Sequence, residues 1–348
     1  MIKIAELLPP VPSLLWKQVH QVGVNYAVGV LPYPSSIDET GAFSWTTNHG
    51  SIEAHEVERT ALGDYPWELE SLRALQASYA AHNLELVVLE SSPPMEKVRL
   101  GLPGRDEEIE LIKTMLRAMG QLGIKVWCYN FMAFESWGRT VVDKPTRGGA
   151  LVTAFDIKDV PTIPVPEGLN LTAEKLWDNL RYFLEQVLPV AEEAGVTLAL
   201  HPDDPPLPSV GGVPRIIVSV DAFQRVIDLV PSPSNGITLC QGNFALMTDD
   251  LPGVIEHFGS QKKIAFVHFR DVRGTAERFE ETFHDDGQTD MLACLRMYRK
   301  IGYTGVLRPD HVPTLAGESN RFPGYETLGR LFAIGYIKGL MQAAYRDD

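Results

Sequence analysis

Four potential metal donors stand just after four consecutive apolar segments in the second half of the chain. They are His201 in LALHPDDPP, Cys240 in LCQGNF, His268 in FVHFRDV and Asp310 in RPDHVP. Two imidazoles, a thiolate and a carboxylate suit Zn²⁺, Fe²⁺, Mn²⁺ or Co²⁺ and suit Ca²⁺ or Mg²⁺ poorly. Neighbouring strands lie about 4.8 Å apart, so side chains from adjacent strand ends can close on one ion. The pattern therefore predicts one divalent metal site.

Each donor also has an ordinary explanation outside a metal site. A cysteine inside an apolar run is commonly a small buried residue, and an aspartate can cap a helix. Asp203 and Asp204 compete with Asp310 for the carboxylate role, although their Pro-flanked loop offers them a turn function. The recurrence of a donor after four successive segments favours the metal site.

Further polar residues are expected near the same place. Glu90 and Asn130 end two earlier apolar runs, while Arg270 and Arg308 flank the donor segments. Because side chains two apart on a strand point to one side, these residues are predicted to bind the carboxylate and hydroxyls of a substrate. The alternative is a charge ladder inside the fold. His284, in FHDDG, is also close enough in sequence to reach this region.

The elements that must position these residues alternate in type along the chain. Eight β-branched or apolar runs are predicted strands: Ile2–Glu6, Val24–Val30, Leu84–Glu90, Lys125–Asn130, Val196–Leu200, Gly236–Leu239, Lys263–His268 and Gly305–Arg308. Amphipathic segments between and after them are predicted helices: Leu14–Gln21, Trp67–His82, Asp106–Leu122, Ala173–Ala194, Asp221–Leu229, Leu251–His257, Met291–Ile301 and Tyr325–Ala344. Strict alternation of strands and helices indicates a parallel sheet.

Eight such units predict an α/β protein with a (β/α)8 barrel, formed by residues 1–348 as a single domain. An open doubly wound sheet would also alternate, but chemistry-bearing residues at many strand ends favour closure. Two strand-to-helix connections are long, from Leu31 to about Pro66 and from about Phe131 to Asn170. Since both follow strands, we expect them at the C-terminal face, as lids or as surface for a partner subunit.

The composition narrows the range of partners. With 31 basic and 45 acidic residues the net charge is −14, which disfavours nucleic acid and anionic membrane surfaces as partners. No apolar run is long enough to span a bilayer, and Pro9, Pro10 and Pro12 interrupt the N-terminal segment. We therefore expect a cytoplasmic protein, with a homo-oligomer as an open possibility. Cys128 and Cys294 lie in apolar contexts and are predicted core residues.

At the level of whole motifs, the chain resembles the mannonate dehydratase family of metal-dependent barrel enzymes. The matching stretches are CYNFM (128–132), SWGRT (136–140), LALHPDDPP (198–206), LCQGNF (239–244), HFRDV (268–272), FHDDGQTDM (283–291) and RPDHVPTLAGE continuing to PGYETLGRLFAIGYIKGLM. The resemblance implies Mn²⁺ or Fe²⁺ bound by His201, Cys240, His268 and Asp310. It also implies proton-transfer roles for the two residues His311 and Tyr325. The segment LLPPVPSLLW and the loop 34–64 differ from the family pattern, which bears on substrate choice.

The resemblance implies dehydration of a sugar acid such as D-mannonate to 2-keto-3-deoxy-D-gluconate. The difficult step is removal of the weakly acidic C2 proton beside a carboxylate, which a metal-stabilised enediolate makes possible. His311 and Tyr325 would then serve as base and acid in an order that the sequence leaves open. An isomerase or epimerase of the xylose-isomerase-like barrel group, working through the same enediolate, is the main alternative. A non-catalytic binder on an enzyme scaffold is the third.

Overall fold

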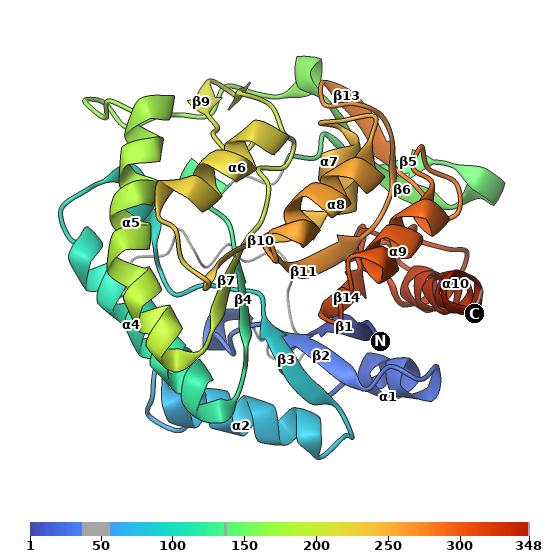
Figure 1. Ribbon diagram of the computed structural model, residues 1–348, viewed down its shortest axis with the longest axis horizontal. Helices are drawn as coiled ribbons and strands as arrows, with labels where there is room; N and C mark the ends of the chain where they lie inside the picture. The colour runs from blue at the N-terminus through green and yellow to red at the C-terminus, as the bar shows by residue number, and fades with distance from the viewer. Residues whose placement is uncertain (37–55, 136–137, 347–348) are drawn as a thin grey trace.

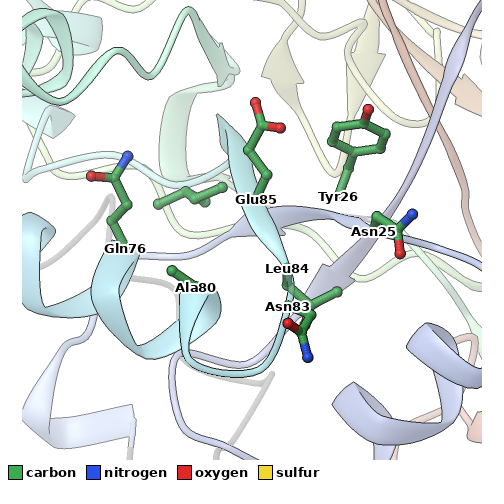
Figure 2. A pocket seen from close by; sticks show the side chains of 8 residues that line it. Asn25, Tyr26, Gln76, Ala80, Asn83, Leu84 and Glu85 are labelled. Atoms are coloured by element: carbon green, nitrogen blue, oxygen red, sulfur yellow. The ribbon is translucent and has the colours of Figure 1, made fainter.

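Eight parallel strands close into a barrel in this protein, whose computed structural model describes residues 1–36, 56–135 and 138–346 (Figure 1). Around the barrel the strands follow the order of the chain: β1 (Lys3–Leu8), β2 (Tyr26–Gly29), β3 (Glu85–Leu89), β4 (Val126–Tyr129), β7 (Thr197–Leu200), β10 (Asn235–Cys240), β11 (Ile264–Phe269) and β14 (Val306–Pro309). Every neighbouring pair is parallel. The predicted (β/α)8 barrel is confirmed.

Helices surround the barrel and bury its outer face (Figure 1). They are α1 (Leu14–Gln21), α2 (Leu69–Ala80), α3 (Glu96–Leu100), α4 (Arg105–Leu122), α5 (Ala173–Ala194), α6 (Val220–Leu229), α7 (Gln241–Ala245), α8 (Leu251–Ser260), α9 (Met291–Lys300) and α10 (Thr327–Tyr345). All eight predicted helices are present, and the short helices α3 and α7 are additional. Among the described residues, no helix combines the length and apolar character needed to cross a bilayer.

Glycines end two of the longest helices and direct the chain into the next strand. Gly123 after α4 and Gly195 after α5 adopt left-handed φ angles of 74° and 63°. That conformation is favourable for glycine because it lacks a Cβ atom, so the helix stops there and its last carbonyls find partners. The chain then enters β4 and β7, whose ends carry residues toward the barrel mouth.

Small and β-branched side chains fill the barrel interior. Val28, Val88, Ala199 and Phe266 are fully buried in one interior group that also contains Cys128. This packed interior is the floor beneath the C-terminal mouth. The predicted core positions of Cys128 and Cys294 are confirmed, because both side chains are buried and belong to the hydrophobic core, although Cys128 Sγ also lies 3.2 Å from the Thr238 hydroxyl.

A four-stranded antiparallel sheet, here called the accessory sheet, is built from two connections on the C-terminal side of the barrel. It pairs β5 (Val141–Pro145) and β6 (Leu151–Asp156) with β12 (Val272–Thr275) and β13 (Arg278–Glu281) in the order β12-β13-β6-β5 (Figure 1). The connection from about Phe131 to Asn170, expected as a lid or as surface for a partner subunit, thus supplies two strands. It also contains the 3-10 turns η4 (Ala133–Glu135), η5 (Arg147–Gly149) and η6 (Ile157–Asp159).

The remaining elements are small. A two-stranded ribbon, β8 (Ser209–Val210) with β9 (Val213–Pro214), follows β7. The other long connection, from Leu31 to about Pro66, contains the turn η1 (Pro34–Ser36), while its residues 37–55 lie outside the described part of the chain, as do Ser136 and Trp137 of the SWGRT motif.

Candidate active site

The ends of four adjacent barrel strands bring the predicted metal donors together. The strands β7, β10, β11 and β14 are successive neighbours in the barrel, and register pairs Cys240 with His268 across β10 and β11. The ligand atoms of His201, Cys240 and His268 all lie within 4.8 Å of one another, and all three side chains are buried. The described residues therefore contain a group of three donors that could hold one metal ion.

One ring nitrogen of each histidine faces the other histidine, and the second ring nitrogen lies near an oxygen atom. His201 Nδ1 lies 2.7 Å from the Pro202 carbonyl oxygen, while its Nε2 lies 3.2 Å from His268 Nδ1. His268 Nε2 lies 3.3 Å from Glu90 Oε1. A metal-binding histidine usually donates its second N–H to a carbonyl or a carboxylate, which fixes the ring orientation. The two facing nitrogens are thus arranged as a ligand pair.

Asp310 borders the donor group and is held by its neighbours. Its Oδ2 lies 3.5 Å from His268 Nδ1, and its Oδ1 accepts hydrogen bonds from Arg308 Nη1 at 2.8 Å and from the Tyr325 hydroxyl at 3.2 Å. Burial alone would raise the pKa of this carboxyl, but Arg308 and His311 hold the pKa well below its usual range. Asp310 is therefore ionised and able to act as an anionic ligand.

Cys240 is prepared as a thiolate. The sulfur is completely buried, and Arg270 Nε donates to Sγ at 3.2 Å. Burial would raise the pKa of the thiol, but the positive charge of Arg270 and the contact with His201 lower the pKa well below its usual value. Because the thiolate is the form that binds metals, the local charge favours metal binding.

A cavity of about 430 Å³ opens onto this group at the barrel mouth. Its walls come from the barrel strands, from the accessory sheet and from the segment before α10: Leu7, Glu90, Arg139, Val142, Thr153, His201, Asp204, His268, Arg308, Asp310, His311, Pro323 and Tyr325. The rings of His311 and Tyr325 meet edge to face with centroids 5.4 Å apart. The structure thus places both predicted proton-transfer residues on the same cavity as the donors.

The charges around the cavity are unbalanced in a way that fits a divalent cation. Five buried or half-buried anionic groups face three arginines in this cluster, here called the site charge cluster: Glu90, Asp204, Cys240, Glu281 and Asp310 with Arg139, Arg270 and Arg308. Two negative charges remain beyond those that the arginines balance. Burial would lower the pKa of His268, but Glu90 and Asp310 raise it well above its usual value, so this negative excess favours a proton on the His268 ring. A buried excess of negative charge is costly unless it is paired or coordinates a metal. The donor set and the charge balance therefore both fit a divalent ion.

A second possible donor group shares His268 and fits a cation less well. Glu90, Cys128 and His268 also have ligand atoms within 4.8 Å of one another. However, Arg308 already donates to both oxygens of Glu90, at 2.6 and 2.9 Å. Burial and the nearby Glu90 charge raise the pKa of the Cys128 thiol, so it stays protonated. The group with Cys240 is the better metal site.

Comparison with known proteins identifies the family. The D-mannonate dehydratase (UxuA) family model matches residues 40–169 and 165–347 of the chain. The chain belongs to the D-mannonate dehydratase family. The matched region extends farther toward the N-terminus than the motifs that carried the resemblance, and the divergent segment LLPPVPSLLW lies before it.

Relatives named as mannonate dehydratases match over most of their length. Mannonate dehydratase 2 of Halalkalibacterium halodurans is 37% identical over 80% of this chain and 88% of its own. The mannonate dehydratase of Streptococcus equi subsp. zooepidemicus is 35% identical over 88% and 94%. The crystal structure of mannonate dehydratase from Streptococcus suis superposes with a TM-score of 0.85 at 32% identity, covering 99% of this chain and 95% of that one. The predicted hydro-lyase class is confirmed at the level of the family.

More distant structures share the barrel alone. A xylose isomerase domain protein from Planctomyces limnophilus has a TM-score of 0.60 at 14% identity, with 99% of both chains covered. A D-tagatose 3-epimerase-like protein has a TM-score of 0.61 at the same identity. At this identity the likeness extends to the fold and carries no information on the reaction.

Within the mannonate dehydratase barrel, two residues expected to bind substrate are not part of the described cavity wall. Arg270 is fully buried and donates to Asp204, Glu281 and Asn243 as well as to Cys240. Asn130 is 6% exposed and accepts a hydrogen bond from the Met132 amide at 3.2 Å. Both stand behind the wall, whereas Glu90 and Arg308 line the cavity.

His284 and Asp203 are also placed away from the cavity wall. The His284 side chain is buried, and burial lowers its pKa to about 4, so that the ring is neutral. Asp203 Oδ2 accepts the amides of Ile216 at 2.9 Å and Ile217 at 3.1 Å. Asp203 therefore has the turn function that was the alternative to metal binding, while its neighbour Asp204 faces the cavity.

Two charged residues at the cavity or in contact with its wall, Arg139 and Glu281, were not among the predicted site residues. Arg139 lines the cavity and donates to both oxygens of Asp204, at 2.8 and 3.0 Å, and to Glu281 at 2.5 Å. Glu281 comes from the accessory strand β13, which is not one of the eight strands predicted from the sequence. A signal for Arg139 was present, because it lies in the SWGRT motif that carried part of the family resemblance.

Proposed function

We propose that this protein removes water from D-mannonate to give 2-keto-3-deoxy-D-gluconate, with one Mn²⁺ or Fe²⁺ held by His201, Cys240, His268 and Asp310. The observation that carries the proposal is the meeting of a donor group and a proton-transfer pair at one cavity in a member of this family. When bound, the cation supplies Lewis-acid stabilisation of negative charge on the oxygens of the substrate.

Tyr325 suits the role of the acid. Burial raises the pKa of its hydroxyl, and the neighbouring Asp310 charge raises it further, so the hydroxyl keeps its proton at neutral pH. Its O–H donates to Asp310 at 3.2 Å, and Tyr325 lines the cavity, which supports a place for this hydroxyl beside a bound substrate. We assign Tyr325 to proton donation at the C3 hydroxyl and His311 to proton removal at C2.

The remaining site residues bind or shape the cavity in this proposal. Arg308 and Glu90 line it and are proposed to contact the carboxylate or the hydroxyls of the substrate. Arg270 and Asn130, predicted as substrate contacts, are proposed to act from behind the wall by holding Cys240, Asp204 and the turn after β4. Residence in the cytoplasm and assembly into a homo-oligomer remain predictions.

A panel of aldonic acids with added Mn²⁺ tests the activity. D-mannonate is expected to yield a 2-keto-3-deoxy acid, detected by its periodate–thiobarbiturate colour and by mass loss of one water. An epimerised or isomerised acid of unchanged mass would favour the isomerase alternative instead. The His311→Ala variant is expected to keep its metal and to lose about 10²- to 10⁴-fold in kcat. Full turnover by a metal-loaded His311→Ala variant would remove His311 from the mechanism.

A further inference from the structure

The accessory sheet carries one carboxylate into the barrel mouth. Glu281 ends β13, is 2% exposed, and is opposite Val272 in the pairing of β13 with β12. Its Oε1 is approached by Arg139 Nη2 at 2.5 Å, by Arg270 Nη1 and by His311 Nδ1 at 2.9 Å. A group from outside the barrel therefore touches the residue proposed to remove the substrate proton.

The contacts around His311 favour one position for the ring proton. Arg139 Nη2 also lies 3.0 Å from His311 Nδ1, but its two hydrogens have three acceptors within reach, and the carboxylates of Asp204 and Glu281 are the charged ones among them. The carboxylate of Glu281 is ionised and can only accept. The contact between Glu281 and His311 at 2.9 Å therefore needs a hydrogen on Nδ1, which leaves Nε2 as the ring nitrogen with a free lone pair.

The backbone adds to the constraint on His311. Its φ angle is +37°, a conformation that side chains other than glycine adopt rarely and that persists where surrounding contacts fix it. In this conformation Nε2 lies on the side of Asp310, 3.9 Å from Oδ1, and His311 lines the cavity. Orientation and tautomer together point the basic nitrogen toward the donor group.

We propose that Glu281 is a positioning residue for His311: its carboxylate holds the imidazole as the Nδ1–H tautomer and so presents Nε2 as the proton acceptor. The inference rests on the proposed function for the role of His311 in proton removal. It makes the accessory sheet a working part of the active site, because the sheet supplies the group that orients the base. A carboxylate that orients a histidine in this way also stabilises the imidazolium formed when the proton is taken.

The competing explanation is that Glu281 only balances the charge of Arg139 and Arg270. Asp204 provides a matched control, because it pairs with the same two arginines, at 2.8 and 2.9 Å, and is equally buried. No hydrogen bond joins Asp204 to His311 among the described residues. Asp204→Asn and Glu281→Gln remove the same charge from the same arginines, and they differ in the contact with His311.

The kinetic test is a double-mutant comparison with the metal-loaded protein. Glu281→Gln is expected to lower kcat about 10- to 100-fold, with KM and metal content within about threefold of the wild-type values. In a protein that already carries His311→Ala, Glu281→Gln is expected to change kcat less than about twofold. Asp204→Asn is expected to lower kcat by the same factor whether or not His311 is present. Equal loss from Glu281→Gln in both backgrounds would overturn the proposal. If the glutamine variant does not fold, Glu281→Asp, which keeps the charge and shortens the side chain, is measured in its place.

A spectroscopic readout separates this proposal from the proposed activity. In protein labelled with ¹⁵N-histidine and loaded with diamagnetic Zn²⁺, the ring signals that disappear in His311→Ala identify His311. The wild type is expected to show a protonated Nδ1 and an unprotonated Nε2, and Glu281→Gln is expected to shift the ring toward the other tautomer. An Nε2–H tautomer in the wild type, or no change in Glu281→Gln, would overturn the assignment. If the protein shows the expected tautomer but does not dehydrate D-mannonate, the proposed function is overturned and the positioning role of Glu281 is not.

Discussion

Replacing Cys240 with alanine is expected to abolish the stabilisation that Mn²⁺ gives to the folded protein. The substitution removes the sulfur from the three-donor group and removes one of the five anionic groups of the site charge cluster. Loss of a residue that merely orients a metal ligand costs about 10- to 100-fold in metal affinity, so loss of a ligand itself should cost at least about 100-fold.

The size of the effect follows from mass action. At a free Mn²⁺ concentration of about 100 times the wild-type Kd, binding stabilises the folded state by about 2.7 kcal/mol. An unfolding entropy of about 2.1 cal/mol/K per residue, over 348 residues, converts this to a rise in Tm of about 4 °C. At the same concentration, a variant with a 100-fold higher Kd gains about 0.4 kcal/mol, which is less than about 1 °C.

The assay is a thermal melt of the metal-free protein across a Mn²⁺ titration, with bound metal counted by elemental analysis. Cys128→Ala is the matched control, since Cys128 is also buried and belongs to the second possible donor group around His268. It is expected to lower the starting Tm through the lost sulfur, by about 1 kcal/mol of stability, and to keep the full rise with Mn²⁺. A full rise in Cys240→Ala, or its loss in Cys128→Ala, would refute the assignment of the metal to the Cys240 side.

Three further outcomes are expected. Tyr325→Phe keeps the ring and removes the hydroxyl, so kcat should fall about 10²-fold with bound Mn²⁺ unchanged; wild-type turnover would contradict the acid role. Burial alone would raise the pKa of Glu281, but Arg270 and His311 lower it to about 2 from an ordinary 4.5. The stabilisation that the ionised Glu281 gives to the folded state is therefore complete above about pH 4.5 and is lost as the pH falls toward 2. Acid unfolding in EDTA, followed by circular dichroism, should therefore be less steep over that range in Glu281→Gln than in the wild type. Arg330→Met leaves Glu6 buried without the cation that approaches it at 2.8 Å and should cost about 3–5 kcal/mol in urea unfolding; adding Glu6→Gln should recover much of that loss.

The barrel and the donor group were predictable because they depend on local patterns. Segments with the residue pattern of a strand and segments with the pattern of a helix alternate eight times along the chain, and this alternation indicates the parallel barrel. Once the barrel is closed, a residue that follows a strand must lie at the C-terminal mouth. His201, Cys240 and His268 needed no information beyond their places at successive strand ends to be brought together.

The accessory sheet was not predictable in the same way. Its strands are four to six residues long and lie in connections rich in turn residues, and β6 pairs with β13 across more than a hundred residues of chain. No local period reveals such a pairing, so Glu281 could not be placed near His311. The side-chain directions of Arg270 and Asn130 were equally hidden, because the chain leaves the regular strand geometry where β11 and β4 end.

The pairing of β6 with β13 also bears on the order of folding. Residue 156 can meet residue 278 only after the chain between them, which supplies barrel strands β7, β10 and β11, has been made and placed. The pairing that closes the barrel, between Lys3 and Val306, spans still more of the chain, and Asp310 follows Glu281 in the sequence. Because loop-closure cost grows only slowly with length, the accessory pairing needs no more of the chain than barrel closure does, so a single late step can complete both the donor group and the contact of Glu281 with His311.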